Sequence, residues 1–168
     1  MRLCLLIGVA ALAVTGCDAE RPPTAEVAQQ GAAAANLTHD DAEKIVADAE
    51  TAWSGNRIEA VMANYADGAV VFDTSTLAPT TDRNVQTRGN AAFLTMSPAD
   101  FRVDPRHVQL LDNDTIVASG VLSFTANVGG GRRLLKTRYT QVYQRQPDGA
   151  FRIVHEHMSS PPAGTGMP

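Results

Sequence analysis

Two histidines near the C-terminal end of the chain are the residues best suited to acid–base chemistry at neutral pH. His155 and His157 are two residues apart in a strand-like segment, so their side chains face the same side of that strand. A pair of imidazoles can transfer a proton or begin a metal site. A metal needs further ligands, and the only other histidines are His39 and His107. The two histidines are therefore candidate acid or base residues, and we expect no metal and no other cofactor.

The composition predicts one folded domain and excludes two classes of protein. The chain has 168 residues, of which 44% are hydrophobic and 19% charged, and its formal net charge is -4. Without an excess of positive charge, it is not expected to bind nucleic acid. Its two cysteines, Cys4 and Cys17, are too few and too close together to hold a domain by disulfides.

The N-terminus carries the pattern of an exported protein. An apolar run, Leu3 to Val14, follows a single basic residue, which is typical of a secretory signal peptide. The next residues, ending in Cys17, resemble the lipobox of bacterial lipoproteins, which implies a lipid on Cys17. The alternative is an ordinary signal peptide cut near Ala19. We expect a protein of the bacterial cell envelope, anchored by lipid to a membrane on its periplasmic or outer side.

The remaining chain divides into a tether, a domain and a tail. Residues 1–16 are the predicted leader, and residues 17–37 are rich in Ala, Pro, Gln and Glu, as in a flexible tether. Residues 38–161 are the predicted domain. Residues 162–168 contain Pro and Gly and are expected to be a disordered tail.

Helical periodicity dominates the first half of the domain and strand periodicity the second. Thr38 begins a helical pattern through Trp53, a second runs from Ile58 to Tyr65, and a short strand ends at Phe72. The other expected elements are a weak strand near Val85, a helix over 89–96, and strands over 103–111, 115–128, 134–144 and 151–158. Helices followed by an antiparallel meander indicate the α+β class, and Pro105 is compatible only with an edge or a bulge.

This order of elements resembles the nuclear transport factor 2-like superfamily, and in particular its SnoaL-like branch of domains of unknown function. The resemblance is carried by the segment YADGAVVFD, which ends at Asp73, and by the last strand, FRIVHEHMS. It implies a cone-shaped, curved, mostly antiparallel sheet wrapped around the N-terminal helices, an α+β roll with an internal cavity. It also implies frequent formation of homodimers through the outer face of the sheet.

The resemblance also assigns candidate residues. In its steroid-isomerase branch, the aspartate corresponding to Asp73 is the base; alternatively, Asp73 binds amides of the following loop. The donors of that branch fall at about Ala49 and Thr140, which are poor acidic donors. Phe151 and Ile153 share the side of the two histidines, which favours that side as the cavity wall. Comparison with the isomerases instead places Val154, Glu156 and Met158 there, and we expect the histidine side.

Four residues are candidate ligand contacts. Trp53 and Tyr65 lie on apolar helix faces, so they either pack in the core or reach the cavity with a polar tip. Arg138 can bind a carboxylate ligand or pair with an acidic side chain, and Thr140 lies on the same strand.

Three functions remain open from the sequence. The first is a membrane-tethered domain that binds a small, mostly apolar molecule. The second is a cofactor-independent isomerase, dehydratase or cyclase that uses Asp73 or a histidine as acid or base. The third is a dimerisation scaffold without a ligand. Two or more polar groups converging in one apolar cavity would favour the enzyme, and a filled cavity would leave only the scaffold.

Overall fold

The structure is a computed structural model that describes residues 36–162. The predicted leader, the lipidation site Cys17 and most of the tether lie outside the described residues, as does nearly all of the tail. No helix within residues 36–162 is long and apolar enough to cross a membrane.

The first helix, α1 (His39–Thr51), begins where the sequence predicts. The Thr38 side chain accepts a hydrogen bond from the backbone amide of Asp41, and the Asp41 carboxylate accepts one from the Thr38 amide at 3.0 Å. These reciprocal bonds satisfy amides that have no partner within the helix. Ala42 and Val46 are fully buried, so one face of α1 packs on the sheet.

The helices that follow are arranged differently from the sequence prediction. The second helix ends at Ala63, and Tyr65 already begins a strand. The weak strand expected near Val85 is wrong, because the Asp82 carboxylate accepts hydrogen bonds from two amides and so starts a helix there. The helical elements are η1 (Ala52–Gly55), α2 (Ile58–Ala63) and α3 (Arg83–Thr95).

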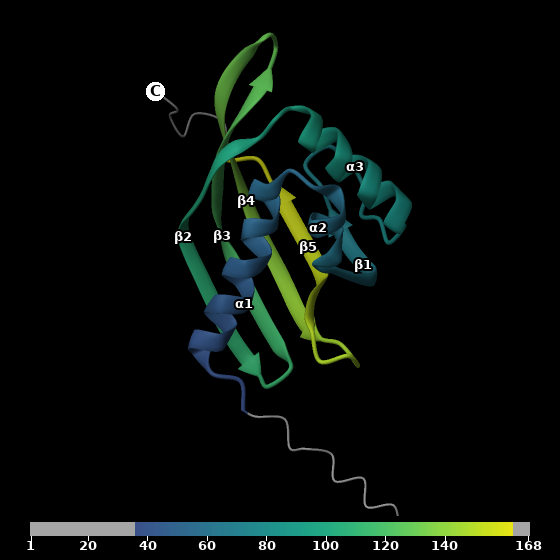
Figure 1. Cartoon of the computed structure of the whole chain (residues 1–168), viewed down its shortest axis with the longest axis vertical. Helices are drawn as coiled ribbons and strands as arrows, with labels where there is room; N and C mark the ends of the chain where they lie inside the picture. The colour runs from purple at the N-terminus through teal and green to yellow at the C-terminus, as the bar shows by residue number, and fades with distance from the viewer. Residues whose placement is uncertain (1–35, 163–168) are drawn as a thin grey trace, which may run out of the picture. The chain divides into compact units, whose positions relative to one another are not determined.

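One five-stranded sheet forms the rest of the domain. Its order is β1-β5-β4-β3-β2; the three pairs from β5 to β2 are antiparallel, whereas β1 and β5 are parallel. Helices α1, α2 and α3 lie over one face of this sheet (Figure 1). This is the α+β class predicted from the sequence. The strands are β1 (Tyr65–Phe72), β2 (Ala99–Asp112), β3 (Thr115–Val128), β4 (Gly131–Arg145) and β5 (Phe151–Ser159).

The core lies between the helices and the face of the sheet that they cover, which we call the inner face. The outer face is the opposite one. Tyr143, Ile116, Val46 and Val61 are the largest side chains that are almost completely buried, and they come from both layers. Their burial holds the helices on the inner face and leaves the outer face without a cover in the described part of the chain.

Two of the bulges in this sheet, in β2 and in β5, bear on the inner face; a bulge is an extra residue or two that locally shifts the pairing register. In β2 this bulge lies between Val103 and Arg106, opposite Val121, so Pro105 occupies a bulge in an edge strand as expected. In β5 the bulge is Val154, because Tyr143 pairs with Ile153 whereas the neighbouring Val142 pairs with His155. Each bulge changes which side chains face the helices.

Candidate functional site

Two adjoining cavities lie at the inner face of the sheet. The first, the aromatic cavity, has a volume of about 270 Å³, and the second, the carboxylate cavity, about 220 Å³. Trp53, Leu122 and Met158 line both. The aromatic cavity is also lined by Asp73, Thr74, Asn90, Phe93, Met96, Phe124, Leu135, Lys136, Thr137 and Ser160. The carboxylate cavity is also lined by Ala47, Glu50, Thr51, Ser54, Phe101, Arg102, Val103, Tyr139, Gln141 and Glu156.

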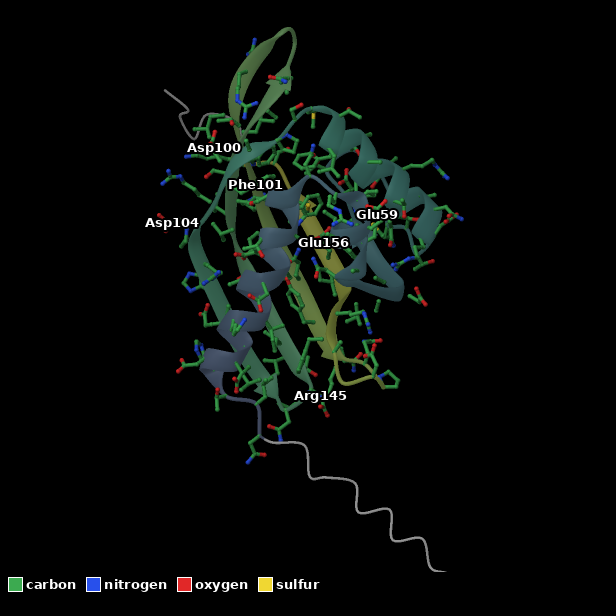
Figure 2. All side chains as sticks on the ribbon, viewed as in Figure 1. Glu59, Asp100, Phe101, Asp104, Arg145 and Glu156 are labelled. Atoms are coloured by element: carbon green, nitrogen blue, oxygen red, sulfur yellow. The ribbon has the colours of Figure 1, made fainter. Side chains whose placement is uncertain are left out.

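A buried glutamate forms part of the wall of the carboxylate cavity. Glu156 is only 3% exposed, and both of its carboxylate oxygens accept from the Tyr65 hydroxyl at 3.0 Å. The Gln141 side-chain amide donates to the same carboxylate, and Gln141 in turn accepts from the Tyr143 hydroxyl at 2.7 Å. Figure 2 shows Glu156 near the middle of the domain, whereas Asp104 lies at the edge strand.

This environment changes the proton affinity of Glu156. Burial, which penalises the charged form, raises the pKa of Glu156 above its ordinary value, although the hydrogen bonds from Gln141 and Tyr65 oppose the shift. The negative charge of Asp73 adds to the rise. Burial also raises the pKa of Tyr65 and that of Tyr143 well above the ordinary tyrosine value. The tyrosines therefore act as neutral hydrogen-bond donors, and Glu156 is the carboxyl group of this network whose affinity for a proton is increased.

A second carboxylate reaches the same cavity from α1. Glu50 accepts from the Tyr139 hydroxyl at 2.9 Å and from the Arg106 guanidinium, also at 2.9 Å. Arg106 is shared, because it also lies 3.0 Å from the carboxylate of Glu43. Two carboxylates thus share one guanidinium, and the group keeps a net negative charge.

The expectation that the two histidines face the cavity is wrong. The bulge at Val154 inserts one residue, so Ile153 and Glu156 both face inward, and the side chains of His155 and His157 point to the outer face. On that face both lie beside Phe72, with ring centroids 6.1 and 5.4 Å apart, respectively. Neither histidine lines the aromatic cavity or the carboxylate cavity. The histidine-side expectation is right for Ile153, which precedes the bulge, and the alternative is right for Glu156 and Met158, which follow it.

The other predicted site residues divide between the two faces. Trp53 lines both cavities, and Tyr65 lies against Glu156. Asp73 lines the aromatic cavity, while one of its carboxylate oxygens accepts from the amide and hydroxyl of Ser75, as the loop-binding alternative expects. Arg138 and Thr140, predicted to contact a ligand, line neither cavity, because both are exposed on the outer face of β4.

The polar residues of the carboxylate cavity were mostly missed from the sequence. Glu156 lies on the side of the strand opposite the one expected to form the cavity wall, and Gln141 and Glu50 are not among the residues expected at the site. The alternation of Tyr139, Gln141 and Tyr143 was a usable signal, since a glutamine between two aromatic residues on one strand face needs a buried partner. Within residues 36–162, no group of three or more His, Cys, Asp or Glu side chains is placed to hold a metal ion.

A bent sheet with helices on its inner face and a polar-ended cavity between them defines the nuclear transport factor 2-like class of α+β proteins. Within this class the chain belongs to the SnoaL-like domain family, which matches residues 42–164. The resemblance stated from the sequence is therefore confirmed for the domain. No match to the chain was found among curated proteins.

Solved structures support the same fold. A Xanthomonas campestris protein, provisionally assigned as an association domain of calcium/calmodulin dependent protein kinase II, is 27% identical with a TM-score of 0.66, covering 76% of this chain and 91% of that one. A provisional ketosteroid isomerase from Parabacteroides distasonis has 17% identity and a TM-score of 0.61, with coverage of 76% and 92%. A provisional dehydratase of the NTF2-like family from Streptomyces avermitilis has 18% identity and a TM-score of 0.61, with coverage of 75% and 100%.

Proposed function

We propose that this protein binds a small, mostly apolar molecule in the two adjoining cavities. The observation that carries the proposal is the lining itself: aromatic, leucine and methionine side chains form the walls, and a few polar groups converge at one end. Such a combination is typical of small-molecule sites, and each of the two adjoining volumes, about 270 and 220 Å³, lies a little below the usual range of roughly 300–1,000 Å³ for a single site. Open space between the layers argues against a scaffold whose core is filled.

The only tryptophan of the chain provides a direct test. Trp53 lines both cavities and contacts Phe93 edge to face, with ring centroids 5.4 Å apart. We expect titration with 4-phenylbutanol to change Trp53 fluorescence in a saturable way. Leu122→Phe should weaken binding about tenfold or more, because Leu122 lines both cavities and the larger ring occupies ligand space.

The neighbouring residue on the same strand serves as the control. Val121 pairs with the exposed Arg138 on the outer face, so Val121→Phe adds the same ring outside the cavities. It should leave the titration unchanged. Equal losses in both variants, or no saturable signal in the wild type, would contradict the proposal. Native mass spectrometry of protein from its own host would identify a retained ligand.

A second candidate function is acid–base catalysis of the isomerase or dehydratase type. It is favoured by Glu156, a buried carboxyl group with a raised pKa in the wall of an apolar cavity. Solved structures provisionally assigned to both enzyme classes share the fold. Glu156→Gln removes the proton-transferring group with little change of shape, so it should abolish turnover of any substrate identified from the retained ligand.

We further propose that the protein is tethered to a membrane by an acyl chain on the sulfur of Cys17. Cys17→Ala should therefore move the protein from the membrane fraction to the soluble fraction of its host. Cys4→Ala is the matched control, because Cys4 lies within the proposed leader, and this change should leave the protein membrane-bound. A membrane-bound Cys17→Ala protein would contradict the tether.

The tethered domain is further proposed to be a homodimer that associates through the outer face of the sheet. The family resemblance supports this proposal, and so does the outer position of partly exposed Phe72 and Val121. Sedimentation velocity on residues 36–168 measures the molecular mass directly, and a monomer at micromolar concentration would exclude it.

A further inference from the structure

We infer that the molecule bound in these cavities is an amine, with a cationic ammonium group at the carboxylate end and an apolar body against the aromatic wall. The inference rests on the proposed binding function and adds to it the chemical class of the ligand. It follows from the two carboxylate side chains, Glu50 and Glu156, that line the carboxylate cavity.

Glu156 has no cationic partner among the described residues. The groups that hydrogen-bond to it, the Tyr65 hydroxyl and the Gln141 amide, are neutral donors, and the ion pairs within residues 36–162 do not include Glu156. A carboxylate buried to this degree is costly in its charged form unless a positive charge accompanies it. The cavity that Glu156 lines leaves room for such a charge to be supplied by a ligand.

The second carboxylate strengthens the preference for a cation. Glu50 lines the same cavity and shares Arg106 with Glu43, so these three side chains together carry one net negative charge. The cation that does line the cavity, Arg102, is exposed. An ammonium group in this cavity would therefore meet Glu156, which has no cationic partner among the described residues, and Glu50, which shares its cation with Glu43. Hydrogen bonds between ionised partners are the strong ones.

The rest of the lining fits the body of such a ligand. Trp53 and Phe101 provide aromatic rings beside the carboxylates, and an ammonium group is attracted to the face of an aromatic ring. Leu122 and Met158 continue the apolar wall into the aromatic cavity, where Phe93 and Phe124 pack edge to face. A slender amine can thus place its charge at Glu156 and its carbon chain toward Trp53.

The proton balance of binding provides a second readout. The titratable and charged groups that face Glu156 are Tyr65 of β1, Asp73 at the end of β1, Tyr143 of β4 and, through the cavity, Glu50 of α1 with its partner Arg106. Burial favours protonated Glu156 in the free protein, whereas an ammonium group favours its carboxylate form. Binding of an alkylammonium should therefore release up to one proton per molecule at a pH where Glu156 is protonated.

Three ligands with the same apolar body separate this inference from the proposed function. They are 4-phenylbutylamine, 4-phenylbutanol and 5-phenylpentanoate, all titrated against Trp53 fluorescence in the full domain. We expect the amine to bind about tenfold or more tightly than the alcohol, and the carboxylate most weakly. Glu156→Gln should abolish the preference for the amine over the alcohol, and saturable binding of the alcohol by this variant would show that it is folded.

The outcomes are distinct. Equal affinities of amine and alcohol, or tightest binding of the carboxylate, would overturn the amine and leave the apolar binding site in place. If none of the three ligands binds, the proposed function fails as well. Calorimetry of amine binding in phosphate and in Tris measures the released proton; a release that persists in Glu156→Gln would assign it to another group and overturn the role of Glu156.

Discussion

Glu156→Gln is expected to be more stable than the wild type at alkaline pH, by a margin that disappears in acid. The pKa of Glu156 is raised in the folded protein above the ordinary value of 4.5, so the folded state keeps a proton that the unfolded chain loses. The wild type therefore loses stability as pH rises above about 4.5 until the folded-state pKa is passed. The loss is about 1.4 kcal/mol for each pH unit by which the pKa is raised. Glutamine has no proton to lose.

Urea unfolding at a series of pH values between 4 and 9 measures this difference. Glu59→Gln, which removes an exposed carboxylate on α2, is the control for losing one negative charge at the surface. The difference in unfolding free energy between Glu156→Gln and the wild type should increase with pH and then become constant. A difference that is flat, or that decreases with pH, would show that burial does not hold Glu156 in its protonated form.

Gly120→Ala should destabilise the domain by about 1–3 kcal/mol, since inserted atoms in a close-packed region force the backbone to move. A methyl group at Gly120 would lie 2.5 Å from the carbonyl oxygen of Pro105, and 3.1 and 3.2 Å from side-chain carbons of Tyr139 and Val103. The nearest of these atoms belongs to backbone, in the bulge of β2, so a side-chain rotation cannot relieve the contact.

The matched control is another glycine whose added methyl group meets no atom. Gly89 lies within α3 and has no neighbour within 4 Å of the added position, so Gly89→Ala should stabilise the domain by about 0.5–1 kcal/mol through helix propensity. Thermal unfolding of both variants should show shifts of opposite sign. If Gly120→Ala unfolds at the wild-type temperature, the close approach of the Pro105 carbonyl is not present in solution.

The fold could be predicted because periodicity and capping act locally. Thr38 and Asp41 define the start of α1 through their own hydrogen bonds, and the change from helical to alternating periodicity marks the sheet. The errors occurred where tertiary structure overrides a local pattern. Tyr65 continues the helical spacing of α2 but is held in β1, where its hydroxyl reaches Glu156.

The candidate site was less predictable because its geometry depends on pairing between strands. Alternation assigns both histidines to the side of Ile153, but the extra residue at Val154 is visible only from the register with Tyr143. The partnership of Glu50 with Tyr139 joins residues 89 positions apart, and no local pattern contains it. Trp53, which lines both cavities, could be selected from the sequence because a large aromatic side chain on an apolar helix face has few places to pack.

The bulge at Val154 has a consequence for how such a cavity can change over evolutionary time. If the strand were regular instead, with Val154 paired to Val142, the following residues would face the opposite way, and His155 and His157 would replace Glu156 and Met158 at the inner face. Gain or loss of this bulge could thus exchange an acidic wall for an imidazole wall while the composition of the strand stayed the same. In this fold, the pairing of one residue is a heritable control of cavity chemistry.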